Sequence, residues 1–191
     1  MARLEVITGP MFSGKTKELV RRLEVARDAE GRLLIVCSTK DKRKVRSIRE
    51  NIKKEGRLKN YRYLFIKTVD SIDELKACVN EYQPNVLAIE EGQFFKKWLV
   101  KGINKFLDLN GSSDFRIIVS GLDMNGWREP FGVMPELMAR ADDVQKLTAI
   151  CFKCKKPANL TYVKNKKQKK VKSGDKDLYE ARCRLCHKLP E

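Results

Sequence analysis

The sequence has a single histidine, His187, among its 191 residues. Histidine changes charge near neutral pH more readily than any other side chain and is the most frequent general base in enzymes. With so little histidine available, we expect any catalytic base in this chain to be a carboxylate.

Long hydrophobic runs are also missing. The longest apolar stretches, Leu33–Cys37 and Val86–Ile89, are far shorter than the roughly 20 residues that cross a bilayer. The N-terminus, Met-Ala-Arg-Leu-Glu-Val-Ile, lacks the apolar segment of a secretory signal. We therefore expect no membrane association and a protein of the cytoplasm or nucleus, with the cytoplasm preferred.

Acidic residues are scarce relative to basic ones. The chain has 41 Lys and Arg against 25 Asp and Glu, a net charge of +16, while 42% of its residues are hydrophobic. That hydrophobic share is above the range of disordered chains, so we expect a folded protein with anionic partners. At roughly 150 residues per domain, the length predicts one domain and a smaller appended unit.

Cysteine is present in a pattern that suggests a metal site. Cys37 and Cys78 stand alone in apolar runs and are expected to be small buried residues. The other cysteines form two C-x-x-C pairs, namely Cys151 with Cys154 and Cys183 with Cys186. Such pairs bind Zn²⁺ tetrahedrally, and four thiolates leave no open position, so the predicted zinc is structural. Because the gap between the pairs is long, we expect the intervening segment to project outward.

Short apolar runs alternate with stretches of helical periodicity, which predicts an α/β fold with a mostly parallel sheet. The predicted strands are Leu4–Thr8, Leu33–Cys37, Val86–Ile89, Arg116–Ser120 and Val144–Ile150. The predicted helices are Lys15–Glu30, closed by Gly31, Ile72–Tyr82, opened by a capping box of Ser71 and Glu74, and Phe95–Leu109, ended by Asn110-Gly111.

The composition changes after Ile150, where we place a boundary between a unit of residues 1–150 and a unit of residues 151–191. The second unit contains a lysine run, Lys164–Lys172, and needs a metal to hold it together. The run is compatible with a solvated loop, a nucleic-acid patch, a localisation signal or a flap over a substrate. Since it contains no aromatic residue for base stacking, functional nucleic-acid binding is not expected.

The strongest motif is Gly9-Pro10-Met11-Phe12-Ser13-Gly14-Lys15-Thr16, which matches G-x-x-x-x-G-K-[ST] between a predicted strand and a predicted helix. In such a loop the backbone N–H groups and the positive end of the helix surround phosphate groups. Lys15 is expected to reach the β and γ phosphates, and the Thr16 hydroxyl to bind Mg²⁺. The motif therefore predicts a site for ATP and Mg²⁺.

A pair of acids, Glu90 and Glu91, ends the predicted strand that begins at Val86. Ligands of open α/β sheets bind at the carboxyl ends of strands, so these carboxylates are placed beside the phosphates. Neighbouring residues of an extended chain point to opposite sides. We therefore expect one of the two carboxylates to face the Mg²⁺ and the other to face an acceptor.

Six segments follow one another as in the type II thymidine kinases, the cellular and bacterial family with a zinc-bound lasso, and the resemblance covers nearly the whole chain. The segments are Gly9–Thr16, Glu91–Phe95, Gly121–Met124, Glu129–Gly132, Leu147–Cys151 and Tyr179–Cys186. The resemblance implies a RecA-like P-loop domain with a small C-terminal zinc-binding lasso domain, assembled as a homotetramer. It also implies transfer of the γ-phosphoryl group of ATP to the 5′-hydroxyl of thymidine, giving dTMP for pyrimidine deoxynucleotide salvage, with feedback inhibition by dTTP.

The resemblance also assigns roles to individual residues, of which Glu91 is the catalytic base. The residues implied on the ATP side are Gly9, Pro10, Met11, Phe12, Ser13, Gly14, Lys15, Thr16, Asp41, Arg43, Glu90 and Gln93. The residues implied in the nucleoside site are Met11, Phe94, Leu122, Gly126, Phe131, Thr161 and Tyr179, together with the lasso residues Lys170, Val171, Lys172, Ser173 and Gly174.

The sequence departs from the family pattern at four places, one of which is the segment Lys44–Glu50 after Arg43. Glu90 replaces the usual Asp, Gly126 followed by Trp127 replaces an aromatic residue, and the lasso is more polar. Other hypotheses stay open. One is a kinase for another pyrimidine deoxynucleoside, and another, allowed by Glu90 and Gly126, is a family member that binds nucleotide without turnover. The net charge of +16 and the lysine run also suggest a zinc-ribbon P-loop ATPase acting on nucleic acid.

Overall fold

The structure is a computed structural model that describes residues 1–29, 31–39, 42–55, 58, 61–111, 113–164 and 177–188, without the side chains of residues 42–44, 47, 54 and 55. Asp41, the lasso residues Lys170–Gly174 and the lysine run beyond Lys164 lie outside the described residues.

A parallel sheet of six strands forms the centre of the fold, in the order β3-β2-β4-β5-β1-β6. Its strands are β1 (Arg3–Thr8), β2 (Leu33–Cys37), β3 (Leu64–Thr68), β4 (Val86–Glu90), β5 (Arg116–Gly121) and β6 (Asp143–Lys146). Every residue of β2 and β4 is buried, as expected for strands covered on both faces, which explains why β2 and Val86–Ile89 of β4 are apolar throughout. The predicted α/β class with a mostly parallel sheet is confirmed.

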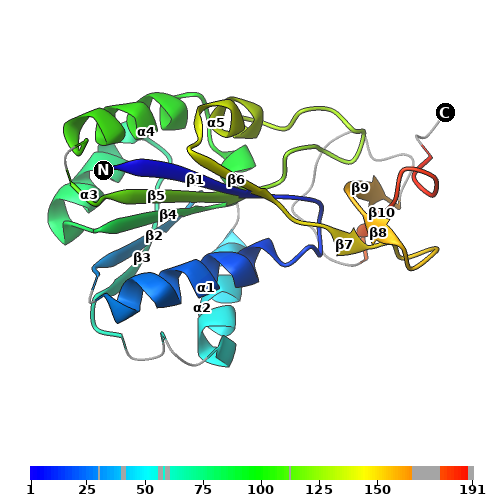
Figure 1. The fold of residues 1–191 in the computed structure, drawn as a ribbon, viewed down its shortest axis with the longest axis horizontal. Coiled ribbons are helices and arrows are strands. Elements are labelled where there is room, and N and C mark those ends of the chain that lie inside the picture. The colour runs from blue at the N-terminus through cyan, green and yellow to red at the C-terminus, as the bar shows by residue number, and fades with distance from the viewer. Residues whose placement is uncertain are drawn as a thin grey trace.

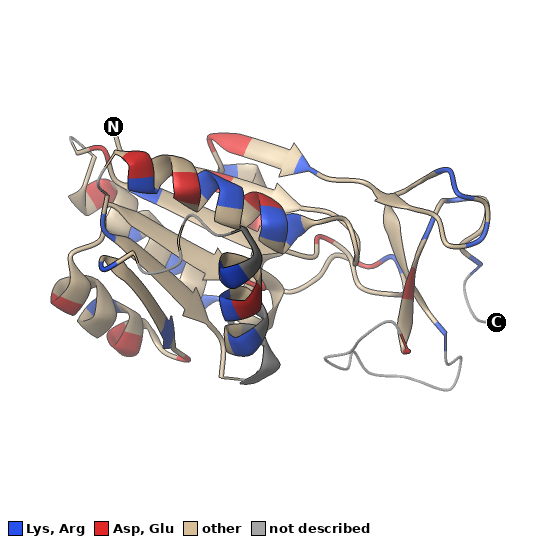
Figure 2. Ribbon diagram, turned by 90° about the horizontal axis from the view of Figure 1, so that it is seen from below, with Lys and Arg blue, Asp and Glu red and all other residues tan. Residues whose placement is uncertain are grey.

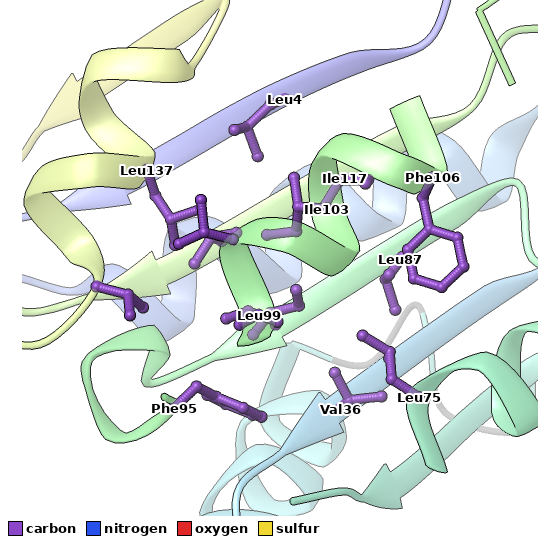
Figure 3. Close-up of a cluster of buried hydrophobic side chains, with 14 of the residues drawn as sticks. Leu4, Val36, Leu75, Leu87, Phe95, Leu99, Ile103, Phe106, Ile117 and Leu137 are labelled. Carbon is purple, nitrogen blue, oxygen red and sulfur yellow. The ribbon is translucent and has the colours of Figure 1, made fainter. Parts of the chain in front are cut away.

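Helices cover both faces of this sheet (Figure 1). The helices are α1 (Lys15–Asp28) and α2 (Lys42–Glu55) on one face, and α3 (Ile72–Tyr82), α4 (Trp98–Leu109) and α5 (Met134–Arg140) on the other. Successive strand residues point to opposite faces. In β5, Ile117 therefore joins the core beneath α4 and α5 (Figure 3), whereas Ile118 joins the core beneath α1 and α2.

Two small antiparallel sheets follow, β7 (Ala149–Ile150) with β8 (Pro157–Ala158) and β9 (Leu160–Val163) with β10 (Tyr179–Arg182). They lie beyond the carboxyl ends of the large sheet, at the right of Figure 1. Their hydrophobic cluster consists of three alanines and Cys151, with Cys183 and Cys186 packed against it. So small a core supports the expectation that this part of the chain needs a metal.

Two predicted boundaries were wrong. The strand predicted from Val144 to Ile150 is divided between β6 and β7, because the chain leaves the large sheet after Leu147. The backbone N–H of Leu147 still donates a hydrogen bond to Thr8 O (2.8 Å). The helix predicted from Phe95 begins at Trp98, because a 3-10 turn over Gly92–Phe94 precedes it and Phe95 has extended backbone angles.

Other local predictions were confirmed. Ser71 caps α3 by accepting a hydrogen bond from Glu74 N (3.2 Å), although the Glu74 carboxylate accepts from Asp70 N rather than from Ser71. Gly31 closes the end of α1 by donating to Ala26 O (3.2 Å). Cys37 is buried as predicted, whereas Cys78 is only partly buried at the edge of the core.

Charged residues lie mainly along the helices, where Figure 2 shows basic and acidic positions interspersed, while the strands of the large sheet are mostly uncharged. Glu5 is an exception on β1: it is buried and accepts hydrogen bonds from Arg22 (2.6 Å) and Arg116 (2.8 Å). Among the helices that the structure describes, none has the length and apolar composition of a membrane span.

Candidate functional site

The loop between β1 and α1 has backbone angles that require glycine at two positions. Gly9 (φ 142°) and Gly14 (φ 86°) lie in the positive-φ range, which residues with a Cβ rarely adopt. At Gly9 a Cβ would also approach Leu147 O to 2.4 Å. Lys15 is buried and donates to Pro10 O (2.7 Å), so its ammonium group is held against the backbone of the loop.

Thr16 joins this loop to the end of β4. Its hydroxyl donates a hydrogen bond to Glu90 Oε1 across 2.5 Å, although the two residues are 74 positions apart. Mg²⁺ prefers oxygen ligands in an octahedron, whose neighbouring oxygens are about 2.9 Å apart. A hydroxyl and a carboxylate oxygen already side by side fit two positions of such a site, so the glutamate that replaces the family's aspartate still reaches Thr16.

Glu91 does not continue the strand as predicted. Its φ of 57° and ψ of 50° are left-handed, so the expectation that Glu90 and Glu91 alternate along an extended chain was wrong. The left-handed residue turns the chain directly into the 3-10 turn over Gly92–Phe94. The Glu91 side chain is therefore oriented by a local backbone conformation of the kind that is often found at functional sites.

Gln93 connects Glu91 with the loop after β5. Its Nε2 donates to Glu91 Oε2, and its Oε1 accepts from Leu122 N (2.9 Å). Two glycines make room for it, because a Cβ at Gly121 would lie 2.6 Å from Gln93 Oε1 and a Cβ at Gly132 would lie 2.3 Å from Gln93 O. Gln93 was predicted on the ATP side, and these two contacts join it to Glu91 and to the loop that carries Leu122.

Several residues predicted to line the nucleoside site contact one another or the phosphate-binding loop. The rings of Phe94 and Phe131 meet edge to face with their centroids 5.9 Å apart. Thr161 on β9 accepts a hydrogen bond from Met11 N (3.0 Å), so β9 lies against the phosphate-binding loop. Tyr179 is buried on β10, opposite Val163 on β9.

Gly126, which the resemblance implies in the nucleoside site, packs against strand β9. A Cβ at this position would approach Val163 Cγ2 to 2.2 Å, so the loop after β5 and strand β9 are in direct contact here. The absence of a side chain thus allows this close packing. Trp127 is partly buried next to it, with its backbone N–H bonded to Asn125 Oδ1 (2.9 Å).

Three groups of predicted residues contribute no described side chain. Asp41 lies outside the described residues, the backbone of Arg43 is part of α2 but its side chain is not described, and the lasso segment Lys170–Gly174 lies outside as well. Their roles remain predictions.

The four cysteines converge although the two pairs are far apart in sequence. Their sulfur atoms all lie within 4.8 Å of one another, and Cys154 Sγ and Cys183 Sγ are 3.6 Å apart. With Zn–S bonds of about 2.3 Å, the edge of a tetrahedral site is about 3.8 Å, so the cluster fits a zinc ion.

The pKa values of two thiols in this cluster are shifted in opposite directions. Burial opposes ionisation of Cys151, but backbone N–H donors of the two cysteine turns outweigh it and lower its pKa to about 6. The neighbouring Cys183 side chain and burial raise the pKa of Cys186 to about 12. The backbone of these turns therefore favours a thiolate, the form that binds metal, at Cys151.

Sequence analysis missed two long-range pairs. Lys146 on β6 forms an ion pair with buried Asp123 after β5 (2.5 Å), and β1 lies between these strands. Arg128 donates from Nε to Nδ1 of buried His187 (3.2 Å). The partners in each pair are distant in sequence and no motif joins them, so the only available signal was the presence of charged residues next to recognised segments.

Taken as chemistry, the site combines a loop for phosphates, a buried ammonium group and a carboxylate beside two aromatic rings. Thr16 and Glu90 hold the phosphate loop against the strand that delivers Glu91. This arrangement can bind a nucleoside triphosphate and present an acceptor to its terminal phosphate.

Comparisons with known proteins agree with this chemistry. The sequence model of the family described as thymidine kinase matches residues 2–187. The chain is 40% identical over 185 residues to the thymidine kinase of Mycoplasma mobile, which covers 96% of this chain and 86% of that protein. It is 41% identical over 186 residues to the thymidine kinase of Mesomycoplasma hyopneumoniae, which covers 97% of this chain and 95% of that protein. The family match spans both the phosphate loop and the cysteine cluster.

Proposed function

The chain belongs to the thymidine kinase family, and from this premise we propose that it transfers the γ-phosphoryl group of ATP to the 5′-hydroxyl of thymidine. The products are dTMP and ADP. The observation that carries the proposal is the junction of Thr16 with Glu90, because it joins the phosphate loop to the end of β4, directly before Glu91.

In the proposed reaction the 5′-oxygen of thymidine forms a bond to the γ-phosphorus while the bond from that phosphorus to the bridging oxygen of ADP breaks. Glu91 accepts the proton of the 5′-hydroxyl, and Gln93 holds the Glu91 carboxylate in place. Lys15 moves from Pro10 O onto the phosphates and stabilises the charge on the transferred group. Such transfers depend on positioning and charge stabilisation more than on covalent help.

Thr16 and Glu90 are the residues that would hold Mg²⁺, since their oxygens are already adjacent. When bound, Mg²⁺ neutralises charge on the β and γ phosphates. Asp41 and Arg43 are proposed on the phosphate side from the resemblance alone.

The nucleoside is proposed to lie between the aromatic pair and the loop after β5. Phe94 and Phe131 offer apolar ring surface, and Leu122 is anchored by its bond to Gln93. Thr161 and Met11 border the same region and are joined by a hydrogen bond. The lasso segment Lys170–Gly174 is proposed to close over the pyrimidine with its backbone groups.

Residues 151–191 are proposed to form a separate unit around a structural Zn²⁺ held by the four cysteines. The fit of the sulfur spacing supports such a zinc-bound unit, and its small apolar cluster also includes Ala149, just before the proposed division. The homotetramer and the feedback inhibition by dTTP are proposed from the resemblance. A cytoplasmic location is part of the proposal, because ATP-dependent salvage and zinc-bound thiolates both suit a reducing compartment.

Transfer of radiolabelled phosphate from ATP to a panel of nucleosides tests the proposal. Thymidine is expected to be the best acceptor. Deoxyuridine, which lacks one methyl group, is expected to be weaker by about 10–200-fold, the range that one methyl group contributes in an apolar pocket. Absence of a labelled 5′-monophosphate with thymidine would contradict the proposal, and efficient labelling of deoxyguanosine would contradict pyrimidine recognition by the lasso.

A further inference from the structure

His187 occupies a buried position between the cysteine cluster and the proposed active site. It follows Cys186 directly and is only 2% exposed. Its backbone N–H donates to Cys183 O (2.9 Å), which fixes it to the second cysteine turn. Its ring meets Tyr162 edge to face at 5.4 Å. A buried imidazole this close to the cysteine cluster, but outside the quartet, requires another explanation.

The ring nitrogens of His187 have two partners from different parts of the fold. Arg128 Nε donates to Nδ1 (3.2 Å), and Nε2 lies 3.0 Å from the backbone oxygen of Thr161. Because a guanidinium group can only donate, Nδ1 must accept. Nε2 therefore carries the hydrogen and donates it to Thr161 O. The two contacts together select one tautomer and one ring orientation.

Arg128 itself has an unusual backbone conformation. Its φ is 66°, a region that non-glycine residues occupy at an energetic cost and that is often retained where it serves a site. Its Nη2 also donates to His187 O. Arg128 lies on the loop after β5 that carries Leu122 and Phe131, so the histidine is tied to the proposed nucleoside site from that side as well.

Thr161 is the link to the phosphate loop. Its backbone oxygen accepts from His187, while its side-chain Oγ1 accepts from Met11 N (3.0 Å). Thr161 is 4% exposed, so both bonds are shielded from water. The positions of Met11 and of the cysteine turn are therefore joined through two consecutive hydrogen bonds.

We propose that His187 is a positioning residue that fixes Thr161, and through Thr161 the phosphate loop at Met11, so that the cysteine cluster contributes to substrate affinity. The proposal deepens the proposed function and rests on it for its kinetic consequence. His187 touches no reacting atom. Its loss is expected to weaken the binding of both substrates while the chemical step is retained.

The test compares His187→Phe with His187→Gln. Phenylalanine keeps the ring but removes both ring hydrogen bonds, whereas glutamine keeps a donor for Thr161 O. Leu185→Ala is the matched control, because Leu185 lies in the same cysteine turn and is 85% exposed. The measurements are zinc content, hydrogen exchange at the Met11 amide by NMR, and KM and kcat with thymidine and ATP.

We expect His187→Phe to retain its zinc, to exchange the Met11 amide about fivefold faster and to raise both KM values about fivefold, as for loss of one buried hydrogen bond. Its kcat is expected to stay within about twofold of the wild type. His187→Gln is expected to restore most of the protection, and Leu185→Ala to match the wild type. In a Thr161→Val background, which lacks the acceptor for Met11, His187→Phe is expected to add nothing to Met11 exchange.

Unchanged Met11 exchange in zinc-loaded His187→Phe would overturn the proposal, and so would an additive effect with Thr161→Val. If His187→Phe does not retain zinc, Arg128→Met removes the donor to Nδ1 from outside the cysteine turn. Faster Met11 exchange in that variant supports the proposal, and unchanged exchange overturns it. Should the wild type fail to phosphorylate thymidine, the proposed function fails, while the exchange measurements still decide whether His187 positions Met11.

Discussion

Single residues in uncommon backbone conformations determine how the site is built. Phe12 (φ 67°), Glu91 (φ 57°) and Arg128 (φ 66°) all have left-handed φ values. Each lies in or beside the segments that carry the phosphate loop, the proposed base and the proposed nucleoside site. Such conformations cost about 1–3 kcal/mol each, so their concentration here indicates that the surrounding packing favours geometry of the site over local stability.

At the proposed base, Glu91→Gln is expected to lower kcat by about 10²–10⁴-fold, because glutamine cannot accept the proton. ATP binding is expected to survive, since glutamine can still accept the hydrogen bond from Gln93. Lys15→Ala serves as the contrast: it removes a phosphate contact and is expected to weaken both ATP binding and turnover. Steady-state kinetics and ATP titration measure both effects. Retention of more than about a tenth of kcat in Glu91→Gln would show that another group is the base.

At Gly126, substitution by alanine is expected to destabilise the fold by about 1–3 kcal/mol, because the new Cβ would collide with Val163 Cγ2. Val163→Ala in the same chain is expected to restore part of the loss. Gly111→Ala is the control, since its nearest neighbours would lie at an ordinary 3.7 Å. Denaturant unfolding measures all of these variants. Equal stabilities of Gly126→Ala and Gly111→Ala would show that β9 can move away from the loop after β5.

Among the elements, β1 lies between β5 and β6, and side chains from both neighbours meet across it. Lys146 on β6 pairs in register with Thr8 on β1, yet its ammonium group reaches Asp123 after β5. The Thr8 hydroxyl also donates to Gly121 O (3.0 Å) on β5. These contacts hold the ends of β1, β5 and β6 together. The phosphate loop begins at the end of β1, and the loop carrying Leu122 begins at the end of β5.

Lys146→Met tests this connection between strands. It leaves the buried Asp123 carboxylate without its cation and is expected to lower the free energy of unfolding by about 1–3 kcal/mol. Lys146→Arg keeps the charge and is the matched control. Adding Asp123→Asn to Lys146→Met removes the uncompensated charge and is expected to recover part of the stability. If the methionine and arginine variants unfold at the same denaturant concentration, the ion pair does not stabilise the strand ends.

In the whole molecule, the large sheet and the cysteine cluster meet at the proposed active site. Met11 and Thr161, which are 150 positions apart, form the bond between them. The packing of Gly126 on Val163 is a second contact between the same two parts. Changes at the cysteine cluster are therefore expected to affect the phosphate loop.

Freshly purified protein is expected to contain about one zinc per chain, because four thiolates complete one tetrahedral site. Cys183→Ala or removal of zinc by a chelator is expected to unfold residues 151–191 and to lower the melting temperature. Cys78→Ala, which changes a cysteine outside the cluster, is expected to retain the metal. Elemental analysis and calorimetry measure these outcomes. Active protein without zinc would contradict the proposed structural zinc site.

The sequence by itself determined the parts that depend on local order. The strand β2, the helix α3 with its Ser71 cap and the phosphate-loop motif were all predicted from neighbouring residues, because hydrophobic period, capping and glycine spacing act over a few positions. The two cysteine pairs were also recognised from the short spacing within each pair. By contrast, the basic helix α2 and the edge strand β3 were not predicted, since neither has a distinct pattern of caps or a fully apolar run.

Only the tertiary structure decided how these parts meet. The left-handed turn at Glu91, the contact of Gly126 with Val163 and the ion pair of Lys146 with Asp123 depend on elements that pack together from distant positions. His187 shows the difference most clearly: the sequence indicated only that one histidine exists, whereas the fold placed it between Arg128 and Thr161. A side chain's partners are set by the packing of whole elements, and that information is not contained in the residues beside it.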